Sequence, residues 1–194
     1  MDDEHDDTIR LDAHAIRVLA HPLRARALSA LRLLGPATAT TLAARLGTHT
    51  GATSYHLRRL ADVGLVEETG AGRGRERWWR PTSRSHSFSP RDVEDSPDAR
   101  ASLTWLRMHY LEQLQERAAR WYAQEQEHGP RWQEAAGMSD DVLELDSVAA
   151  AALVEDLAAV VERYRTGAPV ADPADVRRVV VAFLAIPEVE EARS

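Results

Sequence analysis

Apolar residues in the first part of the chain recur at helical spacing, and proline or glycine interrupts them. The stretch "LDAHAIRVLA" predicts a short amphipathic helix that stops at "HP". Pro22 can then open a second helix at its first position, "PLRARALSALRLL", which Gly35 and Pro36 end. The hydrophobic pattern therefore predicts two bounded helices before residue 37.

Two further helices follow with a tight turn between them. The stretch "TATTLAARLG" predicts a helix with Thr38 or Thr40 as its N-cap and Gly47 at its end. After three or four residues another helix runs from about Thr50 to Val63. A short helix, a tight turn and a second helix form the pattern of a helix-turn-helix.

The two faces of this last helix differ in character. Thr53, Leu57, Leu60 and Gly64 share one side and are expected to pack inward. The opposite side carries small, hydrogen-bonding and cationic residues, namely Thr50, Gly51, Ser54, Tyr55 and Arg58. Such a face suits a helix lying in a DNA major groove, although a solvated helix face has the same composition.

A hairpin is predicted directly after this helix. The strand signals "LVEE" and "ERWWRP" are joined by the glycine-rich "TGAGRGR". Arg73 and Arg75 lie at the tip, where they could approach phosphates or a narrow minor groove, and Arg77 and Arg80 lie on the return strand. Since side chains alternate along a strand, Trp79 is expected inside and Trp78 outside; a solvated arginine hairpin is the alternative.

Net charge divides the chain into three segments. Residues 1–12 form an acidic tail of net charge -5, residues 13–91 carry 13 arginines against four acids, and residues 92–194 carry 10 arginines against 21 acids. A basic block followed by an acidic one predicts two domains with different partners. We place a DNA-binding domain at 13–90, a linker at 91–98 and a C-terminal domain at 99–194.

The order of these motifs resembles the winged helix-turn-helix of the arsenic-repressor-like (ArsR-like) bacterial regulators, in the branch with a long C-terminal extension. "LAHPLR", "SYHLRRLADVGLVEE" and "GRGRERWWRP" carry the resemblance, which covers roughly residues 13–82. It implies a homodimer that controls transcription from a palindromic operator in double-stranded DNA. It also implies base contacts at Ser54 and Tyr55, with Thr50 and Gly51 just before them, and backbone contacts from Arg58, Arg59 and the wing arginines.

Metal sensing and catalysis are not expected. The chain has no cysteine, so the cysteine-pair metal site of this family cannot form. Two sets of residues approximate a histidine-carboxylate metal site: His109 with Glu112 and Glu116, and Glu125 with His128. Such sets are more typical of a solvent-exposed helix face than of a metal site. No nucleophile with a base and no phosphate-binding glycine loop is recognisable, so we expect neither an enzyme nor a cofactor.

The C-terminal half is expected to be an α/β dimerisation domain with a long helix, in a protein that is mainly α with small β. The helix runs from Ala99 to about His128, and its apolar side, the expected dimer interface, comprises Leu103, Leu106, Tyr110, Leu114 and Trp121. "VLELD" predicts a strand, and "SVAAAALVEDLAAVVERYR" predicts a helix capped by Ser147 and stopped by Gly167. Residues 176–186 suit either a helix or a buried strand; we expect a strand that pairs with "VLELD".

The partners follow from this organisation. They are double-stranded DNA and a second copy of the chain. The aromatic residues of the C-terminal half form either a pocket for a small-molecule effector of unknown identity or simply a core and a dimer interface. No membrane partner is expected, since no run of about 18 apolar residues exists. The acidic N-terminus is unlike a signal peptide, so we expect a cytoplasmic protein, at the nucleoid when bound to DNA. A winged-helix module for protein-protein interaction is the alternative.

Overall fold

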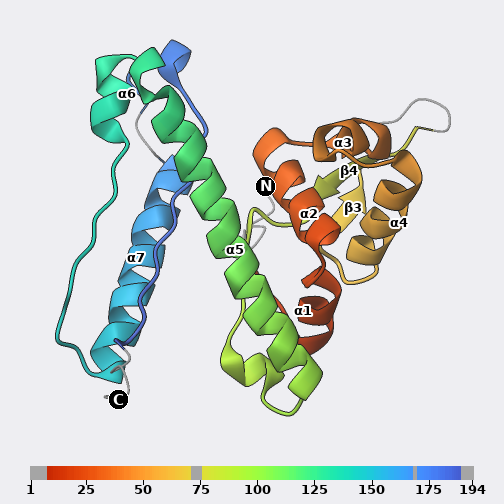
Figure 1. Ribbon diagram of the computed structural model, residues 1–194, viewed down its shortest axis with the longest axis horizontal. Helices are drawn as coiled ribbons and strands as arrows, with labels where there is room; N and C mark the ends of the chain where they lie inside the picture. Colours follow the sequence, from red (N-terminus) through yellow and green to blue (C-terminus); the bar gives the residue numbers. More distant parts are fainter. Residues whose placement is uncertain (1–7, 71–75, 168–169, 189–194) are drawn as a thin grey trace. The chain divides into compact units, whose positions relative to one another are not determined.

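The computed structural model describes residues 8–70, 76–167 and 170–188. The chain forms two compact units, residues 1–118 and 119–194. Helices dominate both units, and the small strands lie in the first (Figure 1). The expectation of a mainly α protein with small β and a winged helix-turn-helix near its N-terminus is confirmed.

The first unit begins with the four helices that the sequence predicts. They are α1 (Ala13–Leu19), α2 (Pro22–Leu34), α3 (Ala39–Leu46) and α4 (Thr50–Ala61). Thr38, rather than Thr40, caps α3, because its hydroxyl accepts a hydrogen bond from the Thr41 backbone N–H at 3.1 Å. Gly47 ends α3 in the left-handed conformation, with φ of 66°, which glycine adopts without the steric cost that a Cβ brings.

The hairpin after α4 joins a three-stranded antiparallel sheet of order β2-β4-β3. Its strands are β2 (Ala37–Thr38), β4 (Trp78–Pro81) and β3 (Val66–Glu68), and Ala37 pairs with Trp79. Trp79 is only 4% exposed, whereas Trp78 is half-buried. The inward orientation of Trp79 is therefore confirmed, and the strand before α3 was not foreseen.

A second, two-stranded sheet pairs β1 (Thr8–Arg10) in parallel with β5 (Ser85–Ser87). Arg10 at the end of β1 forms an ion pair of 2.7 Å with Asp92. Asp92 lies in the 3-10 helix η1 (Pro90–Val93), where Ser89 and Asp92 form a capping box. The sequence predicted a linker at 91–98, and the structure shows an ordered connection there, with Val93 buried.

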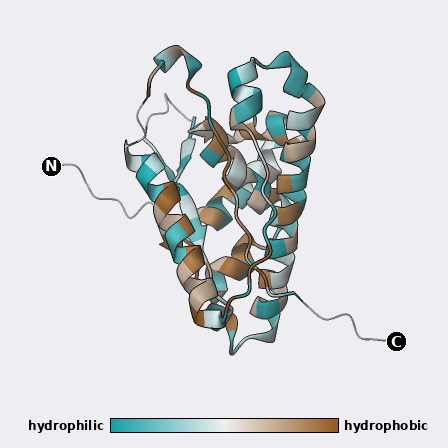
Figure 2. Ribbon diagram, turned by 90° about the vertical axis from the view of Figure 1, so that its left-hand side faces the viewer, coloured by the Kyte–Doolittle hydropathy of each residue, from teal (hydrophilic) through white to brown (hydrophobic). Residues whose placement is uncertain are grey.

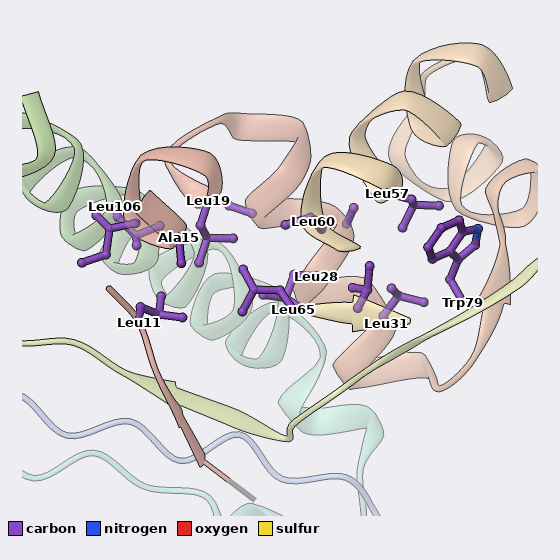
Figure 3. Packing of buried hydrophobic residues seen from close by; sticks show 14 of the residues in the cluster. Leu11, Ala15, Leu19, Leu28, Leu31, Leu57, Leu60, Leu65, Trp79 and Leu106 are labelled. Carbon is purple, nitrogen blue, oxygen red and sulfur yellow. The ribbon is translucent and has the colours of Figure 1, made fainter. Parts of the chain in front are cut away.

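One hydrophobic core holds the first unit together. Leucines of α2 and α4 pack with Leu65 and Trp79 at one end, and Leu11, Ala15 and Leu19 lie toward the other (Figure 3). Helix α5 (Pro97–Gln124) contributes Ala99, Leu103 and Leu106 to the same core. The first part of α5 is thus structurally part of the N-terminal unit.

The C-terminal unit contains α6 (Pro130–Ala135), α7 (Ser147–Gly167) and the 3-10 helices η2 (Glu125–Glu127) and η3 (Pro173–Asp175). Asp146, rather than Ser147, caps α7, because its carboxylate accepts from the Val148 and Ala149 N–H groups at 3.0 and 2.8 Å. The long helix and the helix ending at Gly167 are confirmed.

The predicted strand pair of the C-terminal half is wrong. Residues 142–146 and 176–186 are neither helix nor strand, and both are solvent-exposed. High β-propensity reflects how well a side chain packs on a pleated surface that neighbouring strands provide. Among the described residues no segment supplies such a neighbour to either run, so the apolar sequence alone does not produce a sheet.

Candidate nucleic-acid interface

Helix α4 has one buried face and one exposed face, as its sequence predicts. Thr53, Leu57 and Leu60 are fully buried. Gly64 lies beyond the end of the helix rather than on its inner face; it is exposed and has φ of 71°. There the chain turns, and the Leu65 N–H donates to the Leu60 carbonyl at 3.0 Å.

The residues predicted to contact DNA occupy the outer face of α4. Thr50, Gly51 and Arg58 are exposed, Tyr55 is 54% exposed and Ser54 is half-buried. They begin at the first turn of the helix and continue to its third. The structure therefore brings these five residues together on one accessible surface.

His49 holds the N-terminus of this helix. Its Nδ1 accepts a hydrogen bond from the Ala52 N–H at 3.1 Å, and its carbonyl accepts from the Thr53 N–H at 3.1 Å. The helix has no acidic residue in its first turn. The partial positive charge of the helix N-terminus is consequently not offset by a local carboxylate there, a condition that favours an anion such as phosphate.

Tyr55 lies against a pair of histidines that sequence reasoning missed. Its ring is 5.1 Å from the ring of His56, edge to face, and His56 lies 4.4 Å from His21. His21 is also the N-cap of α2, where its Nδ1 accepts from the Leu23 N–H at 3.1 Å. The two rings therefore connect the exposed tyrosine to the start of a core helix, an arrangement that pairwise sequence spacing does not reveal.

The surroundings lower the pKa of both histidines. Partial burial is the main cause that lowers the pKa of His21, and the nearby positive charge of Arg24 lowers it further. Burial likewise lowers the pKa of His56, with His21 and Arg24 adding to the effect. A lowered pKa favours the neutral form of each ring, which allows the two tilted rings to lie 4.4 Å apart without charge repulsion.

The arginines of α4 differ in their availability. Arg59 forms a surface ion pair with Asp62 at 3.1 Å. Arg58 is exposed, and within the described residues no acidic side chain pairs with it. An exposed ion pair contributes at most about 1 kcal/mol to stability, so Arg59 can exchange Asp62 for a DNA phosphate. Arg58 can bind a phosphate without first releasing an acidic partner.

The wing is described only in part. Arg77, just before β4, forms an ion pair of 2.8 Å with Glu68, and Arg80 on β4 forms one of 2.7 Å with Glu67; both acidic residues lie on β3. Arg73 and Arg75 lie outside the described residues. On the described strands, the arginines are thus matched by carboxylates, which the count of arginines in the sequence does not show.

The residues predicted for the dimer interface do not form one surface. Leu103 and Leu106 are buried in the core of their own chain, and Tyr110 is half-buried. Leu114 remains partly exposed, and the Trp121 ring stacks on His128 at 4.7 Å. In this structure Leu103 and Leu106 are not available to a second chain, because both are buried in the core of the N-terminal unit.

Tyr110 belongs instead to a half-buried polar cluster that no motif in the sequence predicts. Its hydroxyl lies 2.8 Å from Nε2 of His86, and the Arg32 guanidinium donates to Nδ1 of the same ring. Arg32 also donates to the Ser83 carbonyl at 3.1 Å. Through these hydrogen bonds the cluster links α2, β5 and α5.

The candidate metal positions do not converge. His109 Nδ1 lies 3.5 Å from Glu112 Oε2, and the described residues contain no group of three or more histidine or acidic side chains able to hold a metal ion. Within the same residues, no helix is long and apolar enough to cross a membrane.

Comparison with known proteins agrees with the N-terminal geometry. Residues 19–69 match a family described as "Helix-turn-helix domain", of the ArsR type. No curated protein matches the sequence significantly. Among solved structures, the chain is similar to RV1404 from Mycobacterium tuberculosis, with 18% identity, coverage of 77% of this chain and 80% of that one, and a TM-score of 0.30. A TM-score this low says nothing about a shared overall fold.

Proposed function

We propose that this chain, a DNA-binding transcription regulator whose residues 19–69 form an ArsR-like helix-turn-helix, acts as a homodimer on a palindromic operator. The observation that carries the proposal is the outer face of α4. It presents Tyr55 and Arg58 to solvent directly after a helix N-terminus that lacks a local carboxylate.

Each part of this face suits one type of DNA contact. Ser54 and Tyr55 lie in the first two turns, where a recognition helix meets base edges in the major groove. Arg58 lies one turn further on, where a cation meets the phosphate backbone. Arg59 and Arg77 bind the phosphate backbone as well, once they release Asp62 and Glu68. In the wing, Arg73 and Arg75 make further contacts with DNA.

A homodimer follows from the way such domains read DNA. A single helix contacts only one half-site, and two half-sites one helical turn apart require two linked copies. We propose no metal as the signal, because the donors on α5 do not gather into a site. The protein would then act in the cytoplasm, at the nucleoid when bound to DNA.

Selection of bound sequences from a random duplex library tests the proposal. We expect a palindrome whose half-sites lie about 10 base pairs apart, centre to centre. Repeating the selection with Tyr55→Ala should relax the preference at particular positions of each half-site. Arg91→Ala is the matched control, since Arg91 is exposed on η1 outside the motif.

The outcome also separates DNA reading from the other use of a winged helix. A library that returns no sequence preference, with affinity independent of salt, would favour a protein-protein interaction module. A preference that Tyr55→Ala weakens equally at every position would contradict the placement of this residue at base edges.

A further inference from the structure

The C-terminal unit exposes two apolar runs that its own chain does not cover. Run A comprises residues 142–146, "VLELD", and run B comprises residues 176–186, "VRRVVVAFLAI". The large apolar side chains of both runs are between 43% and 96% exposed: Val142, Leu143, Leu145, Val176, Val179, Val180, Val181, Phe183, Leu184 and Ile186. Figure 2 shows hydrophobic colour continuing along extended coil of this unit.

The backbone of residues 142–145 and 176–186 also lacks partners among the described residues. No backbone hydrogen bond joins residues 142–145 or 176–186 to any other described residue. Extended chain at about 3.3 Å per residue makes run A about 16 Å long and residues 179–186 about 26 Å long. Exposed, apolar and unpaired extended backbone of this length is a template for pairing with another chain.

The charges of the two runs are complementary. Run A contains Glu144 and Asp146 and directly follows Asp140 and Asp141, and all four side chains are exposed. Run B begins with Arg177 and Arg178 and carries no acid through residue 186. Arg177 already contacts the Trp132 ring at 5.0 Å, whereas Arg178 is exposed and makes no contact with a described side chain. Run A of one copy and run B of another would therefore attract each other, and run A would repel run A.

A second copy of the chain is the occupant that fits these observations. In a two-fold symmetric dimer, run A of each copy contacts run B of the other, so the contact occurs twice and covers all four runs. Ten exposed side chains per copy supply apolar surface for a stable interface, which buries about 800 Å² per partner. The apolar residues of α5 nearest its N-terminus cannot serve instead, because Leu103 and Leu106 are buried in their own core.

We propose that runs A and B are the segments that form the dimer: each pairs as a strand with the opposite run of a second copy, giving an intermolecular sheet. This inference rests on the proposed function only in its need for two copies. It moves the interface from α5 to the C-terminal unit and explains why strand-like sequences remain unpaired in a single chain.

Hydrogen exchange at several protein concentrations tests strand formation directly. Analytical ultracentrifugation identifies concentrations at which the full chain is monomeric and dimeric. We expect amides within residues 142–145 and 176–180 to exchange freely in the monomer and to become protected in the dimer, where Glu144 lies opposite Arg178. Protection that is already complete in the monomer would show that the runs pair within one chain. A dimer without protection would place the interface elsewhere. Either result, or a chain that stays monomeric at every concentration, overturns the proposal.

Charge exchange between the runs tests which segments meet. Glu144→Arg alone and Arg178→Glu alone should each weaken self-association about tenfold, because each homodimer then contains like charges at both contacts. Mixing the two variants should restore the dimer, because the mixed pair has opposite charges at both contacts. Pairing within one chain, or an interface elsewhere, predicts no such rescue. Arg163→Glu, an exposed reversal on α7, is the control and should leave self-association unchanged.

An apolar variant gives an independent measurement. Leu184→Asp should weaken the dimer, whereas Met138→Asp, at an exposed apolar residue outside both runs, should not. Equal effects of the two would overturn the proposal. Binding of each variant to a duplex with one half-site reports on α4 alone. A variant that loses the dimer but still binds the half-site supports the proposal. If no protein binds the half-site, the unchanged chain included, the proposed function is rejected instead.

Discussion

His86 should make the stability of the N-terminal unit strongly dependent on pH. Arginine can only donate hydrogen bonds, so the bond from Arg32 requires an unprotonated Nδ1 on His86. The proton of the neutral ring then lies on Nε2, which faces the Tyr110 hydroxyl at 2.8 Å. Protonation of Nδ1 would break the bond and place two cations in contact.

Burial, with the charge of Arg32 as a second cause, lowers the pKa of His86 from 6.5 to about 3. Between these values the unfolded chain binds the proton and the folded chain does not, so stability falls as the pH is lowered. For an unfolded pKa of 6.5, a change from pH 7 to pH 5 removes about 2 kcal/mol of unfolding free energy through this one group. The result does not depend on the precise folded pKa, provided that it lies below about 4.

Urea unfolding at pH 7 and pH 5, followed by tryptophan fluorescence and circular dichroism, measures the loss. His86→Gln keeps a hydrogen-bonding side chain that does not titrate, so its loss between the two pH values should be smaller by about 2 kcal/mol. The other histidines and the carboxylates contribute equally to both proteins and cancel in this comparison. An identical loss in the two proteins would refute the assignment of a neutral His86 bonded to Arg32.

Three further predictions concern the fold and the wing. Thr38→Ala should lower the unfolding free energy by about 1 kcal/mol by removing the cap of α3, while the exposed Thr40→Ala should change it by less than about 0.5 kcal/mol, as urea titration would show. Leu28→Ala, at a fully buried position of α2, should cost about 2 to 5 kcal/mol in the same assay; a smaller loss would mean that the site is less tightly packed. Replacing Arg73 and Arg75 together by alanine should reduce the slope of log affinity against log salt by about 1 to 2 units, and an unchanged slope would show that the pair does not contact DNA.

Local signals predicted the N-terminal unit well. Pro22 and Gly47 mark helix ends through their own backbone preferences, and the alternation along β4 separates Trp79 from Trp78. The outer face of α4 follows from helical periodicity alone. These features depend on residues close together in the sequence, so a single sequence is enough to predict them.

Features that depend on distant partners were missed or misread. His86 and Tyr110 meet Arg32 only because β5 and α5 pack against α2, and no spacing in the sequence encodes this. Leu103 has the periodicity of an apolar interface residue, but periodicity does not distinguish a second copy from the core of the same chain. Residues 176–186 have the composition of a strand, yet a strand also needs a neighbouring strand.

The salt dependence of binding to duplex DNA tests the central claim most directly. Affinity for a selected palindromic duplex and for a random duplex should be measured over a range of salt concentrations, for the unchanged chain and for Arg58→Ala. We predict affinity that falls steeply with salt, tighter binding to the selected duplex at every concentration, and a slope smaller by about 1 for Arg58→Ala. Equal affinity for the two duplexes, with no dependence on salt, would contradict a regulator that reads DNA through α4.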